Sequence, residues 1–537
     1  MLSNMTSFKQ TLSTKKTFFT FGLWLLLVWP ALAQSYQGTL RGAVNDSSGK
    51  TLSSATLTLI NEQTNVSRTT VTNESGEYVF ERVDPGRYKI SATLAGFKKT
   101  DRTGVIVETQ QQVTIDLSLA VGEVTETVLI SSEVPLIETS NPSTGTVLSK
   151  QTLDDLPNAG RSPFFLTAIA PNVIAAGNPT YNRQQDQGGS STISLAGGPV
   201  RGNNYIIDGV PITDLTNLAI IIPTIEAIQE VKVQINTYDA EAGRTGGGVF
   251  NTLARSGSND LHGSLFGFVR PSALGANNFF NNRNGVAKPN VPYKLYGGSF
   301  GGPVRVPWLY NGKDRTFFWA AFEGYRQSTF LSDTLTVPTE LERKGDFSRS
   351  GFTVTDPLTG QPFAGNIIPA NRLDPVGARL VTFFPQPRNG QGRFVETSIL
   401  NDRADQQTIK LDHEVTRNYK VSAFYAHYGS REPFANYYNN AANPNGILLA
   451  RGVHALALNN IFTLSPTTLL SVRYGYNTFD NNSAAGSAGF DVASLGFDKS
   501  FLNDIVFKKF PRIEIAGNAY GPSTQSALGG EGPADRR

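Results

Sequence analysis

The chain contains no cysteine among its 537 residues. This absence excludes disulfide bonds, thiolate metal sites, cysteine nucleophiles and a lipid-modified N-terminal cysteine. If the chain is exported, sheet closure and side-chain packing must hold it together without covalent cross-links.

Charge is scarce and nearly balanced. Charged residues make up 17% of the chain, and 47 Lys+Arg against 44 Asp+Glu leave a formal net charge of +3. There is no basic block, so the sequence does not favour a nucleic-acid partner. The abundance of glycine, 52 residues, together with asparagine and threonine suits strands and turns. We therefore predict a mainly β protein.

Histidine is rare, with four residues, and the first is His262. The N-terminal part of the chain thus lacks the histidine ligands of a zinc peptidase. The four histidines are isolated in the sequence, and no catalytic arrangement stands out elsewhere. We predict no catalytic, metal-binding or cofactor-binding residues, and no enzymatic activity.

Long apolar runs are confined to the N-terminus. Residues 1–33 have the pattern of a secretory signal peptide. A positively charged region with three lysines precedes a run of about a dozen mostly apolar residues, Phe18–Trp29, and a cleavage site follows at Ala31-Leu32-Ala33. A membrane anchor is the weaker alternative, because a spanning helix needs about 20 apolar residues. The longest later run, Leu218–Ile225, is far too short. The mature chain is expected to be secreted, periplasmic or in the outer membrane.

Residues 34–120 alternate with a period of two and are divided by turn signals such as AspSerSerGly at 46–49 and AspProGly at 84–86. Short strands at this spacing predict a small β-sandwich. The run GTLRGAVNDSSGKTLSSATLTLIN resembles the carboxypeptidase regulatory-like domain, and the lack of histidine argues that this module is not catalytic.

Residues 121–150 read as a linker. Its β-branched patch covers Thr125, Glu126, Thr127, Val128, Leu129 and Ile130. An extended patch of this kind could add as a strand to a partner's sheet edge. It could equally be the last strand of the sandwich followed by a tether, and the sequence leaves both interpretations open.

Residues 151–256 carry the most specific pattern. A short helical stretch is expected at Leu153–Ala170, and a tight hairpin turn at Asp208-Gly209. The triple glycine 246–248 marks positive φ or a close approach of another segment, unless residues 238–270 are simply an interdomain linker. The runs ISLAGGPVRGNNYIIDGVPITD and AEAGRTGGGVFNTLARSGSNDLHG resemble the plug domain of TonB-dependent outer-membrane receptors of the Oar-like type.

The resemblance implies an α+β plug with a candidate plug motif. The motif residues are Arg201, Gly202, Asp208, Gly209, Gly243, Arg244, Gly246, Gly247 and Gly248. Four arginines are candidates to pair with carboxylates of a surrounding barrel: Arg161, Arg201, Arg244 and Arg255.

Residues 257–537 contain strand-length segments with alternating polarity, as membrane-spanning β-strands have. The expected strands are Leu261–Arg270, Tyr293–Val304, Arg315–Gln327, Gln406–Val415, Asn418–Ser430, Val453–Leu464 and Thr467–Phe479. Aromatic residues that could form an interfacial girdle are Phe317, Phe318, Trp319, Tyr425 and Tyr428. A long insertion near 331–405 is expected to be an extracellular loop, with Asp346, Asp356 and Asp374 as turn or capping residues.

Seven strands are too few to enclose a plug, since plugged transporters have about 22. An open sheet edge in lipid would also leave unpaired backbone groups. We therefore expect the barrel to be incomplete in this chain, and the chain to be the N-terminal part of a longer receptor.

The resemblance implies import across the outer membrane of a Gram-negative-type bacterium. The expected partners are a TonB-type periplasmic energy transducer that grips residues 125–130, outer-membrane lipid, and an extracellular ligand such as an oligosaccharide or peptide. The alternative is an exported β-rich adhesin or carbohydrate-binding surface protein without transport activity.

Overall fold

The fold was examined in a computed structural model of the chain, and most of its elements are β-strands. The structure describes residues 36–122, 127–131, 145–158, 161–176, 191–235, 245–388, 390, 392–444, 446–465, 468–514, 520–522 and 527–530. The predicted signal peptide and the Gly/Asn/Gln-rich patch at 177–190 lie outside these residues. Among the described residues, no helix is both long and apolar enough to cross a membrane.

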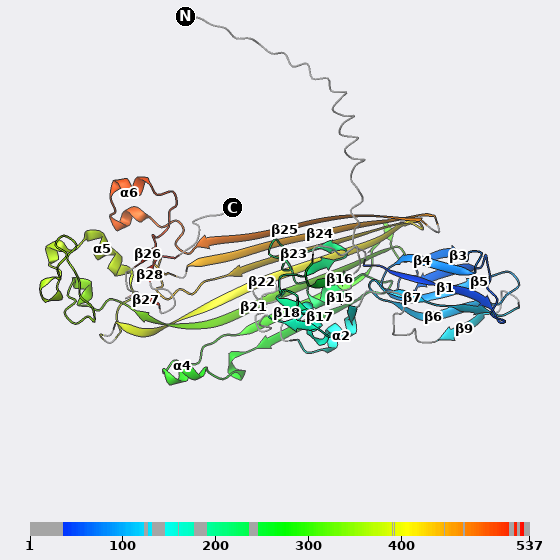
Figure 1. The fold of residues 1–537 in the computed structure, drawn as a ribbon, viewed down its shortest axis with the longest axis horizontal. Coiled ribbons are helices and arrows are strands. Elements are labelled where there is room, and N and C mark those ends of the chain that lie inside the picture. The colour runs from blue at the N-terminus through cyan, green and yellow to red at the C-terminus, as the bar shows by residue number, and fades with distance from the viewer. Residues whose placement is uncertain are drawn as a thin grey trace, which may run out of the picture.

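The N-terminal module is a two-sheet β-sandwich, as predicted (Figure 1). One sheet has the order β4-β1-β7 with β8 also on β1, and the other has the order β3-β2-β5-β6-β9. The alternate apolar residues of the two sheets, such as Leu40, Leu57 and Ile90, are fully buried between them. The strands are β1 Gly38–Asp46, β2 Thr56–Asn61, β3 Ser67–Val71, β4 Glu77–Val83, β5 Gly86–Thr93, β6 Lys99–Val107, β7 Gln112–Thr114, β8 Leu117–Leu119 and β9 Thr127–Ser131.

The segment expected to be a linker contains two strands. β9 pairs in parallel with β6, from Lys99↔Thr127 to Thr103↔Ser131, so it is the last strand of the sandwich. Thr125 and Glu126 lie outside the described residues. The second strand, β10 at Gly145–Ser149, pairs with β15 of the next domain, so the plug sheet begins before residue 151.

The plug is built around a five-stranded sheet in the order β10-β15-β16-β13-β14. Tyr205 and Phe250, on adjacent strands, stack at 4.7 Å, and Phe164 packs against both. The expected helical stretch is broken into short pieces, because Pro157 and Pro163 prevent a continuous helix. The elements are α2 Lys150–Asp155, α3 Pro163–Leu166, η1 Thr167–Ile169, β11 Val173–Ala175, β12 Ile193–Leu195, β13 Asn204–Ile207, β14 Val210–Pro211, η2 Ile225–Ala227, β15 Ile228–Ile235 and β16 Gly248–Ala254.

The C-terminal half forms a long antiparallel sheet in the order β17-β18-β21-β22-β23-β24-β25. Each of the seven predicted strands is present, but most are longer than expected. The strands are β17 His262–Arg270, β18 Tyr293–Pro303, β21 Thr316–Thr336, β22 Arg393–Thr416, β23 Tyr419–Glu432, β24 Ile447–Ser465 and β25 Thr468–Ala485.

The predicted loop at 331–405 was too long. β21 and β22 stay paired up to Thr336↔Arg393, so the connection is only 337–392. The paired segments from residue 328 on β21 and up to residue 405 on β22 carry polar residues on both faces, so the sequence alone predicted a loop there. Asp374 caps a helix and accepts a hydrogen bond from Gly377 N, as expected for a capping residue.

Alternate residues of each strand point to opposite faces of the sheet, so the five aromatic residues predicted to form one girdle do not all face the same way. Phe318 and Tyr425 point to the outer face, whereas Phe317, Trp319 and Tyr428 are buried on the face that meets the plug. Because the side-chain period of a strand is two, adjacent aromatic residues cannot share one face.

The two ends of the sheet differ. The β22–β23 turn and the β18–β21 connection lie beside the sandwich, whose Asp84 and Asn65 contact Lys420 and Asp314, while the other long connections gather at the opposite end (Figure 1). The connecting elements are η3 Ser272–Leu274, α4 Phe279–Arg283, β19 Arg305–Val306, β20 Tyr310–Asn311, η4 Glu342–Lys344, η5 Ala364–Asn366, η6 Ala370–Arg372, α5 Pro375–Leu380, η7 Val381–Phe383, η8 Val492–Leu495, α6 Lys499–Asn503, β26 Ile513–Glu514, β27 Gly521–Pro522 and β28 Ala527–Leu528.

Candidate functional site: the contact between plug and barrel wall

The plug packs directly against one face of the seven long strands of this sheet, which also includes the short β27 on β21, and we call these seven strands the barrel wall. A single cluster of buried apolar side chains joins plug residues such as Ile207 and Ile225 to wall residues such as Phe424, Tyr428 and Ala455. The predicted arrangement of plug and barrel sheet is therefore confirmed for the described residues.

A buried ion pair joins the plug turn to the wall. Lys410 of β22 lies 2.9 Å from Asp208 Oδ2, and both side chains are nearly inaccessible to solvent. Lys410 Nζ also donates to the carbonyl of Ala254, and the Asp208 carboxylate accepts from Ala254 N. Burial raises the pKa of Asp208, and the nearby lysine opposes this effect. The pair fixes the tip of the β13–β14 hairpin against the wall.

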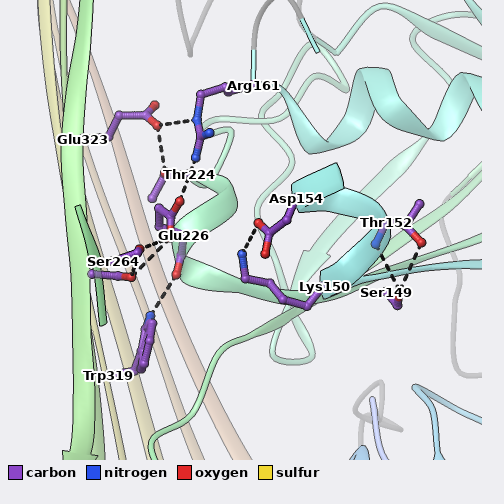
Figure 2. Close-up of polar contacts among 11 residues, drawn as sticks. Ser149, Lys150, Thr152, Asp154, Arg161, Thr224, Glu226, Ser264, Trp319 and Glu323 are labelled. Carbon is purple, nitrogen blue, oxygen red and sulfur yellow. Dashed lines mark hydrogen bonds and ion pairs between the residues drawn. The ribbon is translucent and has the colours of Figure 1, made fainter. Parts of the chain in front are cut away.

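A second polar contact centres on Arg161 of the plug (Figure 2). Its guanidinium lies 3.0 Å from Glu226 in the same domain and 3.5 Å from Glu323 of β21. It also lies over the ring of Phe266 at 4.3 Å. Of the four arginines predicted to pair with barrel carboxylates, Arg161 is confirmed.

Glu226 is held by both domains. Ser264 of β17 donates to its carboxylate at 2.7 Å, and Trp319 donates to its carbonyl at 2.9 Å (Figure 2). Although burial opposes ionisation, the Ser264 hydroxyl, Lys150 and Arg161 hold the pKa of Glu226 below its usual value. The carboxylate thus remains charged within the contact.

The segment that precedes Glu226 is clamped by a wall amide. Gln406 of β22 accepts from Thr224 N at 2.8 Å and donates to the carbonyl of Ile222 at 3.2 Å. Thr224 Oγ1 donates to Glu323 at 2.9 Å. These bonds satisfy backbone groups that would otherwise be buried without partners.

The other three candidate arginines do not form the predicted ion pairs with the wall in the described part of the chain. Arg255 lies over Trp319 at 3.9 Å, a cation–π contact in place of the expected ion pair. Arg201 is exposed and makes no recorded contact with the wall in the described part of the chain. Gly243 and Arg244 lie outside the described residues.

The predicted turn at Asp208-Gly209 is confirmed. Both residues have positive φ, 45° and 78°, as a two-residue hairpin turn of the primed type requires. This conformation exposes the backbone carbonyl of Asp208 to Asn459 Nδ2, which donates to it at 3.1 Å.

Gly247 and Gly248 allow neighbouring segments of the plug to pack close to their backbone. A Cβ at Gly247 would lie 2.3 Å from Asn203 Oδ1, and one at Gly248 would lie 2.4 Å from the carbonyl of Gln234. Gly246 N and Gly247 N both donate to the carbonyl of Gly202 at 2.9 Å. Of the two readings of the triple glycine, close approach is thus the one that Gly247 and Gly248 satisfy.

The sandwich docks where plug and wall meet. Asp84 of the sandwich forms an ion pair with Lys420 of β23, and Thr109 N donates to Glu230 of the plug at 2.5 Å. Although burial raises the pKa of Asp84, Lys420 holds it below its usual value. Burial instead raises the pKa of Glu230 to about 7. The three parts line an open pocket of about 630 Å³.

Sequence reasoning missed the wall partners Glu323, Gln406 and Lys410. Lys410 stands between Ile409 and Leu411, and Glu323 follows the apolar run Phe317–Phe322, so these two were visible in the sequence as polar residues among apolar neighbours, whereas Gln406 has polar neighbours on both sides. What the sequence could not indicate is which plug residue each one meets, because the contacts join residues far apart in the chain.

Comparisons with known proteins agree with this architecture. Residues 253–534, more than half of the chain, match the outer membrane beta barrel domain, and residues 39–120 match the carboxypeptidase regulatory-like domain. The TonB-dependent transporter Oar of Myxococcus xanthus is 26% identical over 354 residues, which are 62% of this chain and 31% of that protein. The chain thus spans about a third of the length of the curated relative it matches.

Solved outer-membrane proteins overlap in part. The outer membrane transporter YddB of Escherichia coli aligns with a TM-score of 0.41 and 14% identity, covering 64% of this chain and 40% of that one. The siderophore receptor PirA of Acinetobacter baumannii aligns with a TM-score of 0.38 and 14% identity, covering 67% and 43%. With more than half of its residues matched by the barrel domain, and with an N-terminal regulatory-like sandwich, the chain belongs to the outer membrane β-barrel domain family.

Proposed function

We propose that this chain supplies the sandwich, the plug and the first barrel strands of a TonB-dependent transporter that imports a substrate into the periplasm. The observation that carries the proposal is the buried polar contact between plug and wall, above all Lys410 with Asp208 and Arg161 with Glu323. Buried ion pairs contribute little net stability compared with apolar packing. Their presence here suits an interface that must be specific and yet open to rearrangement.

Movement of the plug can be blocked chemically. A Cβ at Gly475 of β25 would lie 3.2 Å from Val210 Cβ of the plug, close to the spacing of about 3.5–4.5 Å found in disulfides. The chain has no cysteine of its own, so a Val210→Cys/Gly475→Cys pair would form a single defined cross-link.

The test is a growth screen of a strain that lacks the complete gene, on single sources of carbon, nitrogen and iron. We expect a defect on at least one nutrient, restored by the wild-type gene. The double-cysteine variant should restore growth only when a reductant is added, while the single Val210→Cys variant restores it without one. Equal growth of the cross-linked and reduced forms would contradict import by plug movement.

The segment 125–130 remains the proposed contact for the energy transducer. β9 ends the order of its sheet among the described residues, which suits addition of a partner strand at its outer edge. The proposed ligand is an oligosaccharide or a peptide, in keeping with the length of the connection at 337–392.

The adhesin alternative makes a different prediction in the same strain. An adhesin would lose surface attachment without any nutrient defect, and mild washing would release it from cells. Retention of the protein in the membrane fraction after washing with high salt would argue against that alternative.

A further inference from the structure

Four basic residues form a row across four adjacent strands of the barrel wall. Lys294 of β18 is paired with Arg326 of β21, Arg326 with Arg403 of β22, and Arg403 with Arg431 of β23. Like charges directly opposite each other on antiparallel strands are destabilising. Electrostatic repulsion within the row therefore destabilises the sheet, and packing within the chain gives no reason for four basic residues at these positions.

The row lies on the outer face of the wall. On β22 the residues on either side of Arg403, Asp402 and Ala404, are buried, and Ala404 belongs to the apolar cluster shared with the plug, whereas Arg403 itself is exposed. Arg431 and Lys294 are exposed as well, and Arg326 is half-buried. The basic side chains thus point away from the lumen side.

Few carboxylates accompany the row. Asp405 pairs with Arg326 at 2.9 Å. Asp480 lies on β25, opposite Gly452 and outside the four strands of the row. Within the described residues, Lys294, Arg403 and Arg431 have no recorded ion pair. Three cations at one level are thus available to an external anion.

The position of the row along the membrane normal can be estimated from the belt of apolar residues on the same face of the wall. This belt includes exposed Ile409, Tyr425 and Tyr476. On β23 it extends from Tyr419, which stacks on Phe462, to His427, eight residues or about 26 Å along the strand. At a tilt of about 40° this is about 20 Å across the membrane. Arg431 lies four residues further on, about 10 Å beyond the belt.

Lys294 is the second residue of β18 and Arg431 is the last but one of β23, so the row lies toward the end of the sheet where β18 begins and β23 ends. Figure 1 shows that the long connections gather at this end. In outer-membrane barrels the long connections face outside, so the row faces the outer leaflet at the level of lipid head groups. We propose that Lys294, Arg326, Arg403 and Arg431 bind the phosphate groups of a phosphorylated glycolipid of the outer leaflet. Two opposed guanidinium forks at Arg403 and Arg431 suit phosphate, to which arginine can donate two parallel hydrogen bonds.

The experiment uses the complete gene product, purified in mild detergent and stripped of lipid. The probes are lipopolysaccharide from the host outer membrane, the same preparation after enzymatic dephosphorylation, and inorganic phosphate. A basic residue near a charged membrane surface contributes about fivefold to binding. An Arg403→Gln/Arg431→Gln variant should therefore bind lipopolysaccharide about 25-fold more weakly than the wild type.

Two matched variants complete the design. Arg403→Lys/Arg431→Lys keeps both charges but loses the paired guanidinium donors, so it should bind more tightly than Arg403→Gln/Arg431→Gln and more weakly than the wild type. Arg305→Gln/Lys313→Gln removes the same charge from exposed positions at the opposite end of the sheet and should bind as the wild type does. Equal binding by the Arg403→Gln/Arg431→Gln and control variants would overturn the proposal. So would undiminished binding of the dephosphorylated lipid, or inorganic phosphate that occupies the site as tightly as the lipid.

This proposal depends on the placement of the wall in the outer membrane and not on import. A protein that imports nothing could still bind the lipid, and a transporter could lack the site. The two experiments therefore fail independently.

Discussion

At the scale of single residues, the contact between plug and wall consists of polar side chains buried in an otherwise apolar interface. Such groups cost free energy unless each one has its partner. Lys410, Arg161 and Gln406 meet this condition through side-chain and backbone partners from the plug. The interface is thus selective for one docked position of the plug.

Lys410→Met should destabilise the docked plug by about 3–5 kcal/mol, because the Asp208 carboxylate would remain buried without its cation. Adding Asp208→Asn should recover most of the loss, since asparagine also tolerates the positive φ of 45° at this turn position. Urea unfolding of the purified proteins, followed by protease sensitivity of the plug, measures both effects. A double variant no more stable than Lys410→Met would show that the ion pair is not the cause.

Glu230 makes docking of the sandwich depend on pH. Its pKa is raised by burial to about 7 when docked, against 4.5 for an exposed glutamate. Burial favours the protonated carboxyl, whereas the hydrogen bonds from Thr109 favour the ionised form. Because burial is the larger effect, docking is expected to be strongest below pH 4.5 and to weaken as pH rises to about 7.

Hydrogen exchange of the Thr109 amide, which donates to Glu230, measures this dependence. After correction for intrinsic rates, protection should fall between pH 5 and pH 7 in the wild type. Glu230→Gln cannot ionise and should show constant protection. Glu108 and Lys232 face the same carboxylate, with Glu108 raising and Lys232 lowering its pKa, so a fall that persists in Glu230→Gln would assign the effect to other groups.

At the scale of elements, strands that the sequence presents as separate segments prove to be parts of shared sheets. β10 was expected in a linker but completes the plug sheet, and β9 was expected in the same linker but extends the sandwich. Both strands are short, and their pairing partners are far away in the sequence or in another module. The local sequence pattern could therefore indicate that β9 and β10 are extended, but not which sheet each strand joins.

The proposed strand addition at β9 can be tested with proline. Successive backbone N–H groups of a strand point to opposite edges, so Val128→Pro and Leu129→Pro remove donors from opposite sides of β9. One variant should weaken the pairing with β6, and the other should abolish binding of the purified periplasmic domain of the energy transducer. If both variants bind the transducer as the wild type does, this segment is not its contact.

At the scale of the whole molecule, the three modules are arranged along the length of the wall strands. The sandwich lies at the end of the wall with the short turns, the plug packs on one face, and the long connections lie at the other end (Figure 1). This order matches the expectation that short turns face the periplasm, where a sandwich and an energy transducer would meet.

The complete gene product should behave as a closed barrel on gels. A closed barrel resists unfolding by detergent, because every strand edge is paired. We expect faster migration of the unheated than of the boiled protein, in the outer-membrane fraction. Identical mobility of the two forms would contradict a closed barrel.

The sequence by itself determined the nature of the modules: the sandwich from its period of two and its turns, the hairpin at Asp208-Gly209 from its residue pair, and the wall strands from their alternating polarity. These features depend on neighbours within a few residues, so local chemistry is sufficient to indicate them. The tertiary structure decided which aromatic residues face the plug, where β9 and β10 pair, how far β21 and β22 extend, and which carboxylates meet Arg161 and Lys410. Each of these outcomes joins residues that are distant in the chain, and the free energy that selects them arises only when the modules pack together.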